Sequence, residues 1–205
     1  MDLIAYILPF LVVLILSLSF HEAAHAWSAD RLGDPTARLL GRLTLNPLAH
    51  IDWIGTVLFP LVARISGMPL IGWAKPVPVN PNNLKHPRRD FAMVAAAGPA
   101  SNLLLAAGAW IPLALLSTGE VTGSQLLAFL RDFIQLNVFL AVFNLLPVPP
   151  LDGGNVLAGL VPEQMARVID RLRPYGIFIL YGLLLSGVLV EIARPVDRLL
   201  TRYLP

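Results

Sequence analysis

The chain has 205 residues, of which 56% are hydrophobic and 14% charged, and its mean hydropathy is +0.70. Soluble domains are roughly 45–50% apolar and 25% charged, so this composition excludes that class and indicates a multi-pass membrane protein. The net charge of +2 gives no sign of a nucleic-acid partner. The absence of cysteine excludes disulfides, thiolate nucleophiles and cysteine metal ligands.

The first predicted membrane helix runs from Leu3 to Ala29 and carries the motif H-E-x-x-H near its end, at His21, Glu22 and His25. Histidines at positions i and i+4 lie on one helix face, about 6 Å apart along the axis. Both imidazoles can therefore reach one metal ion. The glutamate beside the first histidine is then placed to act as the general base of a metalloprotease.

The position of this motif strengthens its interpretation as a metal site. The motif follows an uncharged run, Leu3 to Phe20, and so lies at membrane depth. An ionised side chain there costs roughly 2.5–3.5 kcal/mol, and such residues are rare without a function. Three titratable groups within five residues are therefore typical of a functional site.

A short apolar stretch, Trp53 to Ala63, follows the first helix and is too short to span the bilayer. We expect it to be re-entrant or interfacial, because the basic residues on both sides of it then share one side of the membrane. The rule that cytoplasmic loops are rich in lysine and arginine makes that side cytoplasmic. These basic residues are Arg31, Arg38, Arg42, Arg64, Lys75, Lys85, Arg88 and Arg89.

The stretch from Pro69 to Pro81 is predicted to be extended, because its prolines are incompatible with a helix. Prolines in a strand are confined to sheet edges, so we expect a small β element at the membrane surface. Two interpretations remain open. The exposed edge could pair with an unwound substrate, or the element could be a purely structural hairpin.

Three further membrane helices are predicted at Phe91–Leu116, Gln125–Leu146 and Tyr175–Val190. The loop Thr118–Ser124 has no lysine or arginine and is expected outside. The last arginines, Arg194, Arg198 and Arg202, conflict with this topology and could belong to an interfacial helix. The predicted fold is thus an all-α polytopic membrane protein of about four to five membrane helices, with the re-entrant or interfacial segment and the small extended element.

A catalytic zinc site needs three protein ligands and one open position, so a third ligand must accompany the two histidines. Asp152 is the strongest candidate because it follows an uncharged run, and Pro147, Pro149 and Pro150 break the preceding helix. The chain can then fold back at membrane depth to line a cavity. His50 remains an alternative ligand, and His86 is expected to be a solvated loop residue.

Several motifs together resemble those of the site-2 protease family of intramembrane zinc metalloproteases. They are His21–His25, Asn46–Asp52, Gly72–Val79, Gly98–Asn102 and Asn144–Gly154, and they cover roughly residues 15–160. The resemblance implies one Zn²⁺ per chain, held by His21, His25 and Asp152, with Glu22 as the catalytic base. It also implies that Asn102, Asn144 and Pro147 bind substrate or orient the site.

The asparagines allow a second interpretation, because an Asn in a membrane helix can simply join two helices by a hydrogen bond. Small residues in the second membrane helix, Gly98, Gly108, Ala95 and Ala106, are expected to mark close helix packing rather than chemistry.

The resemblance implies a zinc-dependent intramembrane endopeptidase that cleaves single-span membrane proteins within or near the bilayer. We expect one membrane-embedded protease domain over residues 1–205, with its core at about 15–160 and peripheral helices at 161–205. We expect a short form of the family without a PDZ or other soluble domain. The expected location is the bacterial inner (plasma) membrane, with the active site towards the cytoplasm; the lipid bilayer and the substrate are the expected partners.

Two other functions remain open at this point. A membrane zinc-binding or transport protein would also place His and Asp in helices, but it does not need a glutamate next to a ligand. A membrane zinc peptidase of the prenyl-protein type shares H-E-x-x-H but takes a downstream glutamate as its third ligand. Neither accounts for the stretch Leu151-Asp152-Gly153.

Overall fold

The computed structural model describes residues 3–67, 72–117 and 125–204, and all regular secondary structure within these ranges is helical. The elements in chain order are α1 (Leu3–Leu32), α2 (Thr36–Leu39), η1 (Pro47–Ala49), η2 (Trp53–Leu58), α3 (Phe59–Ser66), η3 (Pro81–Asn83), α4 (Pro87–Ser117), α5 (Gln125–Asn144), α6 (Asp152–Leu160), α7 (Glu163–Leu172), η4 (Arg173–Tyr175), α8 (Gly176–Leu185) and α9 (Val188–Tyr203). The loop predicted to be external, Thr118–Ser124, lies outside the described residues.

Helices α1, α4 and α5 are long and apolar enough to cross a membrane, as the sequence predicts. The predicted helix Tyr175–Val190 is wrong as one continuous element, because the chain bends by 66° between residues 163–185 and 188–202. Gly187 lies at the bend with φ +76°, a conformation that glycine adopts readily and that ends α8 before α9 begins. If the bent pair counts as one span, the described helices make up to four spans.

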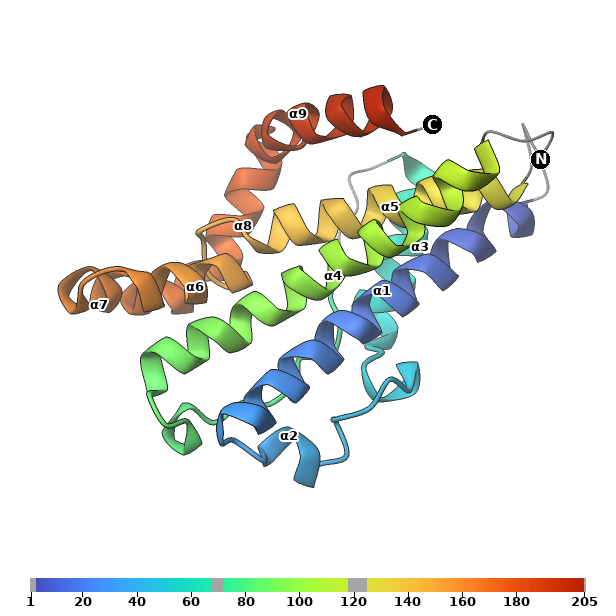
Figure 1. Ribbon diagram of the computed structural model, residues 1–205. Coiled ribbons are helices and arrows are strands. Elements are labelled where there is room, and N and C mark those ends of the chain that lie inside the picture. The colour runs from blue at the N-terminus through green and yellow to red at the C-terminus, as the bar shows by residue number, and fades with distance from the viewer. Residues whose placement is uncertain (1–2, 68–71, 118–124, 205) are drawn as a thin grey trace.

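Helix α4 is the centre of the bundle and packs against α1, α5 and α6 (Figure 1). Between α4 and α5 lies an apolar cluster of Ala106, Leu113, Leu127 and Ile134. Leu200 and Leu204, at the end of α9, pack against this cluster. The pair α8–α9 therefore starts near the end of α5 and finishes beside its beginning.

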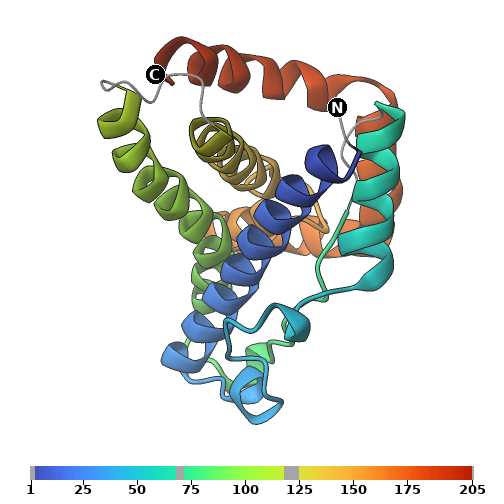
Figure 2. The same ribbon diagram turned by 90° about the vertical axis from the view of Figure 1, so that its right-hand side faces the viewer.

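The segment formed by η2 and α3 has the geometry expected of a re-entrant element. Its residues, Trp53 to Ser66, span about 21 Å at 1.5 Å per residue, less than the roughly 30 Å of a bilayer core. The N–H of Trp73 donates to the carbonyl of Gly55 at 3.1 Å, so the chain returns to the level at which it entered. Figure 2 shows α3 standing beside α1.

Arg64 does not lie beside Arg38, although the sequence predicts that the two share one side of the membrane. Its guanidinium carbon lies 5.2 Å from the ring centre of Phe10, near the start of α1. Arg38, by contrast, pairs at 2.8 Å with Asp30, near the other end of the same helix. The 20 residues from Phe10 to Asp30 correspond to about 30 Å along α1, so Arg64 lies far from Arg38.

Residues 72–80 form an irregular, non-helical segment, which we call the strap. The predicted β element is not formed here, while residues 69–71 of the prediction lie outside the described residues. One edge of the strap is already used: Trp73 donates to Gly55, and Lys75 donates to the carbonyl of His50 at 2.9 Å. The prolines of the strap supply no N–H for a ladder, which explains why no regular strand pairing develops.

Candidate metal centre

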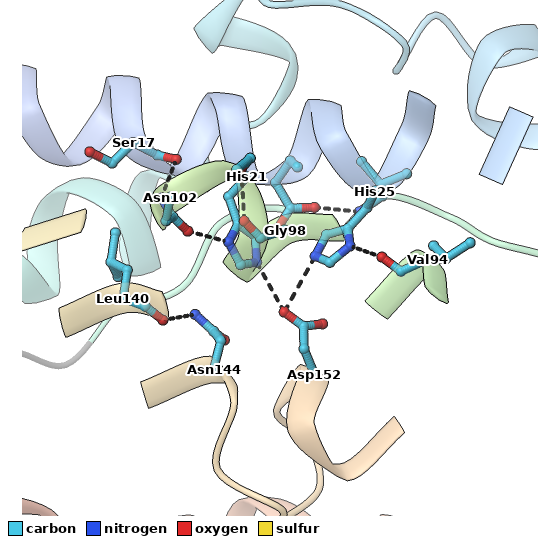
Figure 3. Close-up of polar contacts among 12 residues, drawn as sticks. Ser17, His21, His25, Val94, Gly98, Asn102, Leu140, Asn144 and Asp152 are labelled. Atoms are coloured by element: carbon cyan, nitrogen blue, oxygen red, sulfur yellow. Dashed lines mark hydrogen bonds and ion pairs between the residues drawn. The ribbon is translucent and has the colours of Figure 1, made fainter. Parts of the chain in front are cut away.

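Three metal-binding side chains meet between α1 and the first turn of α6 (Figure 3). Asp152 Oδ2 lies 3.1 Å from His21 Nε2 and 3.4 Å from His25 Nε2. The ligand atoms of these residues all lie within 4.8 Å of one another, and no other such group of three occurs among the described residues. The structure therefore brings together the three residues that the sequence singled out.

Asp152 reaches this position because the chain turns sharply between α5 and α6. A β-carbon at Gly153 would lie 2.3 Å from the carbonyl oxygen of Leu145, and one at Gly154 would lie 2.8 Å from the nitrogen of Pro149. Only glycines allow α6 to begin so close to the preceding loop. Gly153 and Gly154 thus permit the close packing that brings Asp152 to the two histidines.

Both imidazoles present the same nitrogen to the shared space. His25 Nδ1 lies 2.7 Å from the carbonyl of Val94, and His21 Nδ1 lies 2.6 Å from Asn102 Oδ1. A main-chain carbonyl only accepts hydrogen bonds, so the proton of neutral His25 is on Nδ1. Its Nε2 lone pair is left for a metal, and this hydrogen bond holds the ring in place.

Gly98 of α4 leaves the space in which a metal ion would fit. A β-carbon there would lie 2.4 Å from His25 Nε2 and 2.6 Å from His21 Nε2. Two imidazole nitrogens and a carboxylate oxygen form a ligand set that suits zinc and keeps a position open. Gly98 is closely packed, as predicted, but its neighbours are the imidazoles, so the expectation that it marks packing rather than chemistry holds only for the packing. The prediction of close packing is wrong for Gly108, where nothing lies within 4 Å of an added β-carbon.

Glu22 is not part of the ligand group but touches the strap. Its Oε2 accepts a hydrogen bond from the backbone N–H of Val77 at 2.8 Å. A cavity of about 600 Å³ is lined by His21, Glu22, His25 and Asp152, together with strap residues and apolar residues of α8. The carboxylate beside the ligands thus faces a space large enough for part of a peptide.

The three residues predicted to bind substrate or orient the site, Asn102, Asn144 and Pro147, occupy different places. Asn144 lines the cavity, and its amide donates to the carbonyl of Leu140 at 2.9 Å. Asn102 is fully buried and contacts His21 instead of the cavity, so its placement fits an orienting role and not substrate binding. Pro147 is exposed and does not line the cavity; it belongs to the turn that positions Asp152.

The two remaining histidines lie outside the ligand group. His50 is buried, and its Nε2 donates to the carbonyl of Thr44 at 2.9 Å. His86 is exposed, as expected of a solvated loop residue. The alternative in which His50 is the third ligand therefore finds no support in this arrangement.

Sequence reasoning missed two partners of the site. Asn137 of α5 is fully buried and contacts Asn102, and the Val77 N–H contacts Glu22. Asn137 could have been noticed as an amide within the uncharged run Phe133–Leu151. A backbone donor such as the Val77 N–H leaves no sign in the sequence, because every residue except proline has one.

Comparison with known proteins gives consistent results. The family model Peptidase family M50 matches residues 111–186. The chain is 42% identical over 182 residues to Putative zinc metalloprotease YwhC of Bacillus subtilis (strain 168), covering 84% of this chain and 78% of that protein. It is 31% identical over 198 residues to Putative zinc metalloprotease Rip2 of Mycolicibacterium smegmatis, covering 91% and 71%. No solved structure matches the chain.

Proposed function

The chain belongs to peptidase family M50, the site-2 protease family, and from this premise we propose that it is a zinc-dependent intramembrane endopeptidase that cleaves single-span membrane proteins within or near the bilayer. The observation that carries the proposal is the meeting of His21, His25 and Asp152 beside one cavity that Glu22 also lines. A binding or transport protein would have no use for that fourth residue.

Each residue of the site has a distinct proposed role. His21, His25 and Asp152 hold one Zn²⁺ per chain. When bound, zinc would polarise a peptide carbonyl and make a water molecule more acidic. Glu22 accepts the proton released as water attacks the carbonyl carbon and later donates it to the leaving amine. Both transfers need Glu22 to face the cavity without being a ligand, as it does here.

The substrate must unwind locally before it is cut. A carbonyl inside a transmembrane helix is already hydrogen-bonded to an N–H four residues later and is shielded by side chains. The cavity offers the amide of Asn144, which can donate to a freed substrate carbonyl, in line with the predicted substrate-binding role. Apolar residues of α5 and α8 line the same cavity and fit an apolar substrate segment.

We place the site towards the cytoplasm of a cell membrane and assign all 205 residues to one domain. The basic residues Arg31, Arg38 and Arg42 follow the ligand histidines at the same end of α1. His21 lies nine residues before Asp30, about 13 Å along the helix from that end. Water therefore has the shorter path to the site from the basic, cytoplasmic side.

The test is Glu22→Gln, which keeps the size of the side chain and removes its basicity. We expect near-normal zinc content, because all three proposed ligands remain, and a fall in cleavage of roughly 10²- to 10⁴-fold. Zinc content and product formation from one single-span membrane protein in liposomes are measured side by side with the wild type. His21→Ala is the control and should lose zinc and activity together. Undiminished cleavage by Glu22→Gln would refute the mechanism in which Glu22 is the general base.

A further inference from the structure

A buried hydrogen-bond relay links α5 to the metal centre. Asn137 and Asn102 both have no exposed surface. The Asn137 amide nitrogen donates to the carbonyl of Phe133 at 2.9 Å and to Ser17 Oγ at 2.8 Å, while its oxygen accepts from Asn102 Nδ2 at 2.8 Å. Asn102 also donates to the carbonyl of Ser17 at 3.3 Å. The relay thus connects three membrane helices, α1, α4 and α5.

Two main-chain carbonyls fix the direction of every bond in this relay. The Phe133 carbonyl only accepts hydrogen bonds, so the NH₂ group of Asn137 must face it and the Asn137 oxygen must face Asn102. The same argument orients Asn102, whose NH₂ group faces the Ser17 carbonyl and the Asn137 oxygen. The Asn102 oxygen is then left for the third partner.

That third partner is the imidazole of His21. The Asn102 oxygen lies 2.6 Å from His21 Nδ1 and can only accept, so the proton of the neutral ring is held on Nδ1. The lone pair of Nε2 then points at Asp152, the direction in which a metal is bound. His25 needs no relay, because the Val94 carbonyl fixes its Nδ1–H directly.

We propose that Asn137 is a positioning residue that fixes the tautomer and ring orientation of His21 through Asn102, although it touches neither the ligand atoms nor the cavity. The inference rests on the proposed function, because it assumes that His21 holds a zinc ion. Its test measures zinc binding and does not require proteolysis. A hydrogen bond that merely joins two membrane helices contributes about 0.6 kcal/mol to stability on average. Loss of a group that orients a metal-binding histidine typically lowers metal affinity about 10- to 100-fold.

The experiment measures zinc retention by the purified, zinc-loaded full chain against a competing chelator. Asn137→Leu removes the acceptor for Asn102 and should lower zinc affinity about 10- to 100-fold. Asn137→Asp keeps that acceptor, and a buried carboxyl stays neutral and can donate to the Phe133 carbonyl. This variant should retain zinc much better than Asn137→Leu. Gln135→Leu also replaces an amide side chain by leucine, two residues earlier on α5, and should leave zinc affinity unchanged.

The pattern across the variants separates positioning from packing. A packing role predicts that Asn137→Leu and Asn137→Asp behave alike, or that leucine is tolerated better in an apolar bundle; either result would overturn the proposal. If Asn137→Leu does not fold, the wild-type chain stripped of zinc still tests the idea. Nitrogen NMR of its histidines, at a pH where the His21 ring is neutral, should show the ring proton on Nδ1, and a neutral ring protonated on Nε2 instead would contradict the relay. Failure of Glu22→Gln to lower cleavage would leave these readouts unaffected.

Discussion

At the scale of single residues, the metal centre depends on the lack of a side chain at Gly98 as much as on the proposed ligands. Gly98 faces both ligand nitrogens so closely that any β-carbon would enter the space for a metal. The imidazoles cannot retreat, because the Val94 carbonyl and Asn102 hold their far sides. The site therefore tolerates no substitution at this position of α4.

We expect Gly98→Ala to abolish zinc binding and cleavage while α4 itself stays helical. In a helix, alanine is favoured over glycine by roughly 0.5–1 kcal/mol, so the loss would come from the collision with the imidazoles and not from the backbone. Zinc content by metal analysis, with helicity by circular dichroism, checks the expectation. Gly108→Ala, on the same helix but with open space around the added carbon, is the matched control and should keep zinc. Full zinc in both variants would contradict the geometry.

The three proposed ligands could be predicted from the sequence, whereas the residues that orient them were predicted only in part: Asn102 was named through the resemblance, and Asn137 was not. His21 and His25 follow from helix periodicity, and Asp152 follows from its place after an apolar run and a proline break. The relay through Asn137 depends on how α5 is rotated against α4, which an Asn in an uncharged run that also contains Gln135 and Asn144 does not reveal. The resemblance left open whether Asn102 binds substrate or orients the site, and its burial, which tertiary packing decides, fits the orienting role.

At the scale of elements, the strap is held to α1 by two carboxylates. Glu22 accepts from the N–H of Val77, and Asp34, just after α1, accepts from the N–H of Asn80 at 2.6 Å. Asp34 also accepts from Asn83 and Thr36. Its burial alone would raise its pKa, but these hydrogen bonds hold the pKa of the Asp34 carboxyl below its ordinary value.

Asp34 should make the stability of the protein depend on pH. Because its pKa is lowered in the folded state, the carboxylate stabilises the fold above the ordinary pKa of aspartate, and this contribution is lost as the pH falls through the folded value. Asp34→Asn should unfold at lower temperature than the wild type at pH 7, since a buried amide nitrogen faces the donors of Asn80 and Asn83. Thermal unfolding in detergent at decreasing pH should show this difference shrinking. A difference in unfolding temperature that stays constant down to acid pH would exclude a contribution of the Asp34 charge to stability.

The bond between the strap and Glu22 can be removed by one substitution. Val77→Pro deletes the N–H donor within a stretch that already contains Pro76 and Pro78. A hydrogen bond to a charged group is worth about 1.5–3 kcal/mol, so turnover should fall roughly tenfold or more, with zinc content unchanged. We expect the loss in kcat, because the bond orients the proposed base. A rise in KM alone would assign the strap to substrate binding instead.

Two controls isolate the N–H of Val77 from the stiffness of proline. Val77→Ala keeps the donor and should retain activity. Val79→Pro adds the same ring two residues later, where the described residues offer the backbone N–H no hydrogen bond. Equal loss in Val77→Pro and Val79→Pro would show that rigidity, and not the bond to Glu22, is responsible.

At the scale of the whole molecule, composition and hydropathy predicted the membrane class and the three long helices, because apolar runs of that length have few other solutions. They did not predict the bend at Gly187 or the far position of Arg64. Both depend on the course of short helices: α3 packs beside α1, and the left-handed Gly187 separates α8 from α9. That course is decided by local packing, which a hydropathy pattern does not contain.

The arrangement of the helices predicts which ends share a side of the membrane. Lys85 lies just before α4, on the side of the ligand-bearing end of α1, and Gln125 opens α5 at the opposite end. Arg198 of α9 lies close to Leu200, which packs beside the beginning of α5, so Arg198 should share the side of Gln125. We propose that the side of Lys85 is cytoplasmic, because lysine and arginine are abundant around it.

Cysteine labelling can test this topology without background, because the chain has no cysteine. In intact cells, a membrane-impermeant maleimide should label Gln125→Cys and Arg198→Cys but not Lys85→Cys. In inverted vesicles the pattern should reverse. All three positions are exposed in the fold, so absence of labelling would come from the membrane and not from burial. Labelling of Arg198→Cys together with Lys85→Cys would mean that α8 and α9 do not cross with α5, and the bent pair would then be an interfacial or re-entrant element instead of a broken span.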